Sequence, residues 1–194
     1  MPDRPAVFLD RDDTLIDNRG VTAHTPTPGD LFDPALVRLL PGVGEGCAKL
    51  QAAGFALVVT TLQGGIAMGL GTMDQVEAVN DALRSALAKF KVTLDGVYYC
   101  PARPHQATPR TIARWNRPHP WRKPAPGMIQ AAALDLGLDL SRSWTIGDMP
   151  RDVEAGVNAG LPASRCVRIA PGDAGAARDF ADAVARVLRG HRKG

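Results

Sequence analysis

The chain is poor in cysteine, with only three in 194 residues. These are Cys47, Cys100 and Cys166, an odd number at wide spacing, which argues against a disulfide framework. The chain also lacks an apolar run of about 18 residues, the length that a membrane-spanning helix needs. Its first residues lack the basic start and apolar run of a signal peptide. We therefore expect a cytoplasmic protein that binds no membrane.

A strong excess of charge is absent too, because 23 basic residues face 20 acidic ones. The basic residues gather in two segments. We expect segment 186–194 to be a frayed, solvated tail. Segment 100–124 contains six basic residues, which suits an anionic partner: Arg103, Arg110, Arg114, Arg117, Arg122 and Lys123. The length and ordinary apolar content predict a single domain over residues 1–194, and we expect a monomer.

Short apolar runs alternate with helical patterns along the chain. The predicted strands are 6–9, 55–60, 96–99, 143–146 and 165–169, and the predicted helices are 42–53, 73–90, 126–136, 151–159 and 176–188. This alternation predicts an α/β fold, a Rossmann-like parallel sheet of about five strands with helices on both faces. Segments 17–34 and 100–124 are rich in proline and polar residues. We expect them to be loops beside a ligand crevice, with no large cap domain.

Polar groups gather where the predicted strands end. They are Asp10, Asp12 and Asp13 after the first strand, Thr61 after the second, Lys123 after the long loop that follows the third, and Asp148 and Asp152 after the fourth. Clustered carboxylates repel one another unless a hard cation such as Mg²⁺ offsets their charge. A hydroxyl and an ammonium can hold phosphate oxygens. The pattern therefore indicates phosphoryl transfer to a carboxylate nucleophile.

Each of these residues alone has a simpler explanation. An aspartate after a strand often caps a turn or a helix, and we favour that role for Asp13 and Asp17. Asp152 fits either role. A functional site is favoured by the joint occurrence of the others, which are Asp10, Asp12, Thr61, Lys123 and Asp148.

Four stretches of the chain resemble the motifs of the haloacid-dehalogenase-like phosphatases: "FLDRDDTL", "VVTTLQGGIAMG", "RKPAPGM" and "IGDMPRD". They resemble more closely the capless branch that contains D-glycero-D-manno-heptose-1,7-bisphosphate phosphatase and the histidinol-phosphatase domain, and "LLPGV" fits that branch. The resemblance implies a phosphoric monoester hydrolase of carbohydrate metabolism. It would act on a small phosphorylated metabolite such as heptose 1,7-bisphosphate through an aspartyl phosphate. Histidinol phosphate is the alternative substrate.

The resemblance also implies roles for individual residues. Asp10 would be the nucleophile, and Asp12 would protonate the leaving oxygen and then activate water. Thr61 and Lys123 would bind the phosphoryl group, and Arg122 is a candidate for substrate binding.

A magnesium site is implied in the same way. Asp10, the backbone carbonyl of Asp12, and Asp148 would hold Mg²⁺, with Asp152 supporting them from behind.

Many members of the branch hold a structural zinc ion in the loop before the Arg-Lys-Pro motif, through a Cys-x-His pair and a Cys-x-Cys pair. Such a site needs four ligands. Here the first pair reads Cys100 and Ala102, and the second reads His119 and Trp121. Two positions cannot bind metal, although His105 could supply a third ligand. We expect no structural zinc.

The chain departs from the family at several positions. The family usually has Gly where this chain has Asp13, and a polar residue is common where it has Met149. In the second motif the family usually has Asn, Ser and Arg where this chain has Leu62, Gly64 and Met68. The loss of the Arg removes a cation that could face an anionic substrate.

Three rival functions remain. A receiver domain also uses Asp, Thr, Lys and Mg²⁺, but its phosphorylated Asp follows a later strand than its acidic pair. A catalytically weak binding protein on the same fold would explain the altered second motif, and turnover of an aryl phosphate would exclude it. The basic segment 100–124 with Trp115 and Trp121 could bind nucleic acid. We expect instead that it faces an anionic metabolite.

Overall fold

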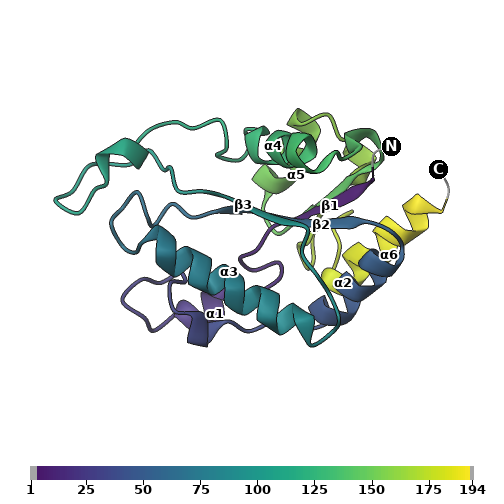
Figure 1. The fold of residues 1–194 in the computed structure, drawn as a ribbon, viewed down its shortest axis with the longest axis horizontal. Coiled ribbons are helices and arrows are strands. Elements are labelled where there is room, and N and C mark those ends of the chain that lie inside the picture. Colours follow the sequence, from purple (N-terminus) through teal and green to yellow (C-terminus); the bar gives the residue numbers. More distant parts are fainter. Residues whose placement is uncertain (1–3, 193–194) are drawn as a thin grey trace.

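Five parallel strands form one sheet at the centre of the protein (Figure 1). The computed structural model describes residues 4–192. The strands are β1 (Ala6–Leu9), β2 (Ala56–Leu62), β3 (Gly96–Cys100), β4 (Trp144–Gly147) and β5 (Cys166–Arg168). They lie in the order β3-β2-β1-β4-β5, and each neighbouring pair is parallel. The predicted parallel α/β sheet is therefore confirmed.

Helices cover both faces of this sheet, as predicted (Figure 1). They are α2 (Val43–Ala52), α3 (Met73–Ala88) and α6 (Phe180–His191) on one face, and α4 (Gly127–Leu136) and α5 (Pro150–Asn158) on the other. The side chains of β1 alternate between the faces, as in any strand. Val7 and Leu9 belong to the core under α2, α3 and α6, whereas Ala6 and Phe8 belong to the core under α4 and α5.

Strand β2 continues past its predicted end at residue 60. Thr61 and Leu62 pair with Tyr99 and Cys100 of β3, so the sheet extends the strand. Thr61 therefore lies inside β2 rather than after it, where its backbone is held by a neighbouring strand.

Helix starts follow local capping groups. A capping box begins α3: the Thr72 backbone N–H donates to the Gln75 side chain at 2.9 Å, and the Gln75 N–H donates to the Thr72 hydroxyl at 3.2 Å. The predicted start of the last helix at residue 176 is wrong. Helix α6 begins at Phe180 because the Asp179 carboxylate caps it, accepting from the Asp182 N–H at 2.8 Å.

The prediction of a frayed C-terminal tail is also wrong for the residues that the structure describes. Helix α6 continues to His191, whose ring lies 4.5 Å from the ring of Phe55 between centroids. The Arg186 guanidinium donates to the carbonyls of Gly175 and Ala176. Apolar packing and these bonds hold the segment, although Lys193 lies outside the described residues.

The two predicted loops differ in regularity. Segment 17–34 contains a short helix, α1 (Asn18–Thr22), and Asp17 caps it by accepting from the Gly20 N–H at 2.8 Å. The capping role favoured for Asp17 is confirmed. Between β3 and α4 the chain forms only one 3-10 turn, Ala113–Trp115. No separate cap domain covers the sheet within residues 4–192 (Figure 1).

Within residues 4–192, no helix is both long enough and apolar enough to cross a bilayer.

Candidate active site

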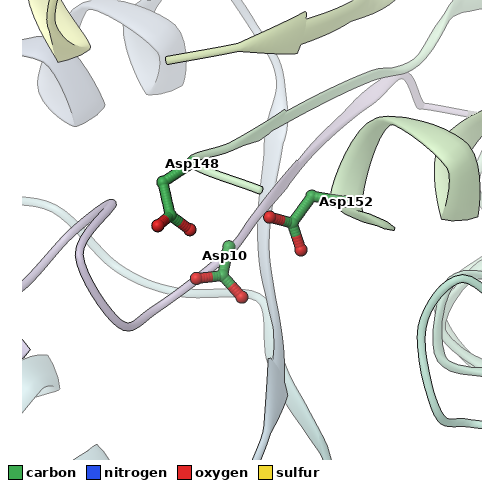
Figure 2. A group of neighbouring side chains, drawn as sticks. All are labelled: Asp10, Asp148 and Asp152. Carbon is green, nitrogen blue, oxygen red and sulfur yellow. The ribbon is translucent and has the colours of Figure 1, made fainter. Parts of the chain in front are cut away.

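The site lies where the order of the strands reverses. Strand β1 lies between β2 and β4, and ligands of open parallel sheets bind at such a point. Asp10 directly follows β1, and its backbone N–H donates to the Ile146 carbonyl of β4 at 2.9 Å. Asp148 directly follows β4. Topology therefore brings two carboxylates together that are far apart in the sequence, as Figure 2 shows.

Three carboxylates converge at this point (Figure 2). Asp10, Asp148 and Asp152 each offer an oxygen, and these atoms lie within 4.8 Å of one another. The Lys123 ammonium donates to Asp10 at 2.8 Å and to Asp152 at 2.7 Å. The second oxygen of Asp152 accepts from the Met149 N–H at 2.9 Å. The predicted residues Asp10, Lys123, Asp148 and Asp152 are therefore neighbours.

The charges of this cluster do not balance. Burial raises the pKa of the Asp10 carboxyl to about 8, opposed by Lys123 and reinforced by Asp152 and Asp12. Burial raises the pKa of Asp148 as well. The pKa of Lys123 is also raised, because two carboxylates outweigh the effect of its burial. Three carboxylates meet a single buried ammonium here, which donates to Asp10 and Asp152. Their hard oxygen ligands fit a divalent cation such as Mg²⁺.

Asp12 lies in a separate network on the other side of Asp10. The Arg11 side chain is fully buried and donates to both Asp12 oxygens, at 2.9 and 3.2 Å. Its third contact is the Asn80 side-chain oxygen on α3, at 2.9 Å. The Gln63 amide donates to Asp12 and to the Thr61 hydroxyl, both at 2.9 Å. Two predicted residues, Asp12 and Thr61, are thus held by neighbours that sequence reasoning missed.

A signal for these missed residues exists in the sequence. Arg11 stands between two aspartates, and Asn80 is a polar residue beside the apolar stripe of α3. A buried arginine needs several acceptors, and these are the acceptors that the fold supplies.

The backbone at Asp13 explains why glycine is usual at this position in the resembled motif. Its φ of 57° lies in the left-handed region, where glycine is favoured and aspartate is tolerated. Its carboxylate accepts from the backbone N–H groups of Asn18 and Arg19 at 3.1 and 2.9 Å. The capping role favoured for Asp13 is confirmed.

Arg19 links this turn to the acidic cluster, a contact that the sequence did not indicate. Its Nε lies 3.1 Å from an Asp13 oxygen, and a terminal nitrogen lies 3.0 Å from an Asp148 oxygen. The Arg19 side chain is 67% exposed, so water screens both ion pairs. An exposed arginine therefore already contacts one carboxylate of the candidate metal site.

A pocket of about 340 Å³ opens over Asp10. Asp12, Thr61 and Asp148 line it together with Asp10, whereas the predicted Lys123 and Asp152 are not among its lining residues. Its walls also carry four arginines, Arg19, Arg103, Arg122 and Arg151. Arg122 had been predicted to bind substrate. It is half-buried and donates to the Ala102 carbonyl at 3.0 Å.

Side chains pack the loop in which we expect no structural zinc. Cys100 and Ala102 are fully buried, and Trp121 packs against them. The His119 ring accepts from the Trp121 N–H at 3.1 Å. Both ring nitrogens of His105 have partners, the Arg103 carbonyl and the Thr111 hydroxyl. That the loop binds no zinc stays a prediction.

Known proteins resemble this chain along most of its length. A heptose-bisphosphate relative, the D-glycero-beta-D-manno-heptose-1,7-bisphosphate 7-phosphatase of Yersinia pestis, is 34% identical over 84% of this chain and 80% of its own length. The family model described as HAD-hydrolase-like matches residues 120–182.

Solved structures share the fold. A protein from Mesorhizobium loti, assigned as a HAD-like phosphatase, superposes with a TM-score of 0.78 at 30% identity, over 97% of this chain and 88% of that one. The D,D-heptose 1,7-bisphosphate phosphatase of B. bronchiseptica, complexed with magnesium and phosphate, has a TM-score of 0.73 at 24% identity, over 96% of this chain and 99% of that one. The chain therefore belongs to the heptose-1,7-bisphosphate phosphatase family of haloacid-dehalogenase-like phosphoric monoester hydrolases.

Proposed function

We propose that this phosphatase hydrolyses a small sugar phosphate, with D-glycero-D-manno-heptose 1,7-bisphosphate as the first candidate substrate. One observation carries the proposal. Asp10 and Asp12 line one pocket together with four arginines, and the Lys123 ammonium lies 2.8 Å from an Asp10 oxygen. The names of the curated relatives support the choice of sugar.

The first step transfers the phosphoryl group to Asp10. A carboxylate oxygen of Asp10 attacks phosphorus, and the bond between phosphorus and the sugar oxygen breaks. Asp12 gives its proton to the departing oxygen, which leaves as an alcohol. Lys123 and the Thr61 hydroxyl hold the phosphoryl oxygens while charge moves onto them.

The second step releases phosphate. Asp12, now ionised, takes a proton from water as the water oxygen attacks phosphorus. The bond from phosphorus to Asp10 breaks, which restores the carboxylate. Asp12 regains its proton in the same step, so the cycle closes without a further reagent.

Magnesium would be held by Asp10, the backbone carbonyl of Asp12, and Asp148. A bound divalent cation supplies positive charge that keeps Asp10 ionised and offsets the charge of the phosphate. Asp152 would support the site without binding Mg²⁺ itself, because its oxygens already accept from Lys123 and from the Met149 N–H. Support comes from the donor set, which consists of oxygen atoms only.

The four arginines of the pocket favour a substrate with a second anionic group. Histidinol phosphate carries no second anionic group for these arginines, so we place it second. We further propose that residues 1–194 act as a single-domain cytoplasmic monomer without nucleic-acid or membrane partners. The pocket supports the single-domain monomer alone, because one chain supplies all the groups that the mechanism uses.

A substrate panel tests the proposal. Purified protein with Mg²⁺ would be assayed for phosphate release from heptose 1,7-bisphosphate, heptose 7-phosphate, hexose phosphates, histidinol phosphate and an aryl phosphate. We expect release from the sugar phosphates, with the bisphosphate preferred. Equal or faster release from histidinol phosphate would reverse our ranking, and no release from any of the compounds would contradict the proposed reaction.

A further inference from the structure

Arg103 extends into the pocket, near the Asp30 carboxylate but without an ion pair to it within residues 4–192. Its backbone is fixed, because its N–H donates to the Trp115 carbonyl at 3.0 Å and its carbonyl accepts from the His105 ring at 2.8 Å. Its side chain is exposed and lines the same pocket as Asp10. Within residues 4–192 its guanidinium makes no ion pair and no hydrogen bond. The loop thus fixes the backbone of Arg103, whereas the guanidinium at the end of its side chain, here called the arm, forms no bond within residues 4–192.

Gly64 provides the space in which this arm lies. A Cβ atom added at Gly64 would stand 2.8 Å from Cδ and 3.0 Å from Cβ of Arg103. Real side-chain contacts are not that short, so any other residue at position 64 would move the arm. Gly64 belongs to the second motif, only three residues after Thr61. The absence of a side chain there and the presence of Arg103 in the pocket are therefore linked.

The charges around the arm place it near other groups of the pocket. Burial raises the pKa of Asp30, and Arg103 is the strongest group opposing that rise. Burial lowers the pKa of Arg122, and the positive charge of Arg103 adds to that effect. Two guanidinium groups that repel each other across a pocket gain most from an anion placed between them.

We propose that Arg103, lying against Gly64, is a specificity-determining residue that acts with Arg122 to bind a second phosphate of the substrate, on the end away from Asp10. The inference rests on the proposed phosphatase function. A phosphate dianion can accept paired N–H donors from each guanidinium. Arg103 thus supplies a positive charge to this pocket, which Met68 does not line.

The experiment compares two sugars that differ only in the second phosphate, heptose 1,7-bisphosphate and heptose 7-phosphate. The specificity ratio is kcat/KM for the first divided by kcat/KM for the second, measured by phosphate release. In Arg103→Met we expect this ratio to fall about tenfold or more, mainly through a higher KM for the bisphosphate, because charge-assisted hydrogen bonds are lost. The matched control is Arg117→Met, an exposed arginine of the same loop outside the pocket, which should keep the wild-type ratio.

A second variant changes Gly64, which lies against the Arg103 side chain. Gly64→Ser displaces Arg103 without removing its charge, so the ratio should fall in the same direction. The double variant Gly64→Ser with Arg103→Met should show no further fall beyond Arg103→Met, because both changes act on one contact. Thermal unfolding of each variant checks that the fold is retained.

Three results would overturn the inference or part of it. An unchanged ratio in Arg103→Met would show that the arm does not bind the second phosphate, while the phosphatase function would stand. Independent, additive effects of the two substitutions would break the link between Gly64 and Arg103. Release from neither sugar by the wild-type protein would overturn the proposed substrate and this inference together.

Discussion

The edge of the sheet and the basic rim of the pocket are built in opposite ways. At the sheet edge, Asp10 and Lys123 are buried and bonded to each other, and Asp152 is fixed by two donors. At the rim, Arg103 and Arg151 are exposed and extend from a loop and a helix start. The first region is set by strand order and by burial, whereas the second depends on the course of loops.

This difference separates chemistry from specificity. Burial makes each charge at the sheet edge costly unless it is paired, so few arrangements are tolerated there. Exposed arginines at the rim keep their hydration and can change without unfolding the protein. We therefore expect substitutions at the edge to remove the reaction and substitutions at the rim to change which substrate reacts.

The largest effect should come from Asp10→Asn at the edge. An amide cannot attack phosphorus, so phosphate release should fall by at least about 10³-fold. Circular dichroism should show a retained fold. The control is Asp33→Asn, an exposed cap whose role asparagine can also fill. Turnover near the wild-type rate in Asp10→Asn would refute the nucleophile and with it the contrast between the two regions.

Metal removal should come next. Chelation with EDTA should abolish phosphate release, and added Mg²⁺ should restore it. Asp148→Ala should raise the Mg²⁺ concentration for half-maximal activity by about tenfold or more, since one ligand is lost. Asp81→Ala, at an exposed ion pair on α3, is the control and should not shift it. Full activity after exhaustive chelation would argue against a metal site at the edge.

A smaller effect is expected at Asn80, which accepts a hydrogen bond from the Arg11 side chain. Asn80→Ala leaves one buried N–H of Arg11 without its acceptor, which should lower the free energy of unfolding by about 1–3 kcal/mol. Urea denaturation measures this change. Asn158→Ala removes an exposed hydrogen bond to the Pro124 carbonyl and should cost clearly less. Equal losses of stability in the two variants would mean that the buried hydrogen bond of Asn80 contributes no more than the exposed one of Asn158.

The smallest effect should come from Arg19, which joins the two regions. Arg19→Gln removes a cation that contacts Asp148, so Mg²⁺ should bind more tightly, by no more than about fivefold for an exposed ion pair. Calorimetric titration with Mg²⁺ measures this without turnover. Arg84→Gln, at another exposed ion pair, is the control. Weaker Mg²⁺ binding in Arg19→Gln would show that Arg19 supports the metal site instead of competing with it.

Sequence reasoning found the groups that stand at strand ends. Asp10 and Asp148 could be predicted because each follows a short apolar run, and parallel strands bring such ends together. The correct assignment of Asp13 as a cap rested on the same local reasoning. The missed contacts are long-range ones, since Arg11 and Asn80 are 69 residues apart and Arg19 and Asp148 are 129 apart. Local patterns carry no information on such pairings.

The errors at the end of the chain have a similar cause. The last residues read as a solvated basic tail because Arg186, Arg189 and Arg192 are close together in the sequence. In the structure Arg186 finds carbonyls near residue 175, and His191 packs on Phe55. The predicted helix start failed because Asp179 was not recognised as a cap. Packing partners outside a segment decided its structure.

The fully buried Arg11 ties the reactive turn to the hydrophobic core. Its guanidinium joins Asp12 to Asn80 on α3, so opening of the turn after β1 would break these hydrogen bonds of a buried charge. We therefore expect local opening of this turn to cost nearly as much as global unfolding. The backbone amide of Leu15, which donates to the Arg11 carbonyl at 2.9 Å, should exchange with solvent deuterium as slowly as the amides of β1. Such exchange would mean that the site and the core unfold together, as one cooperative unit.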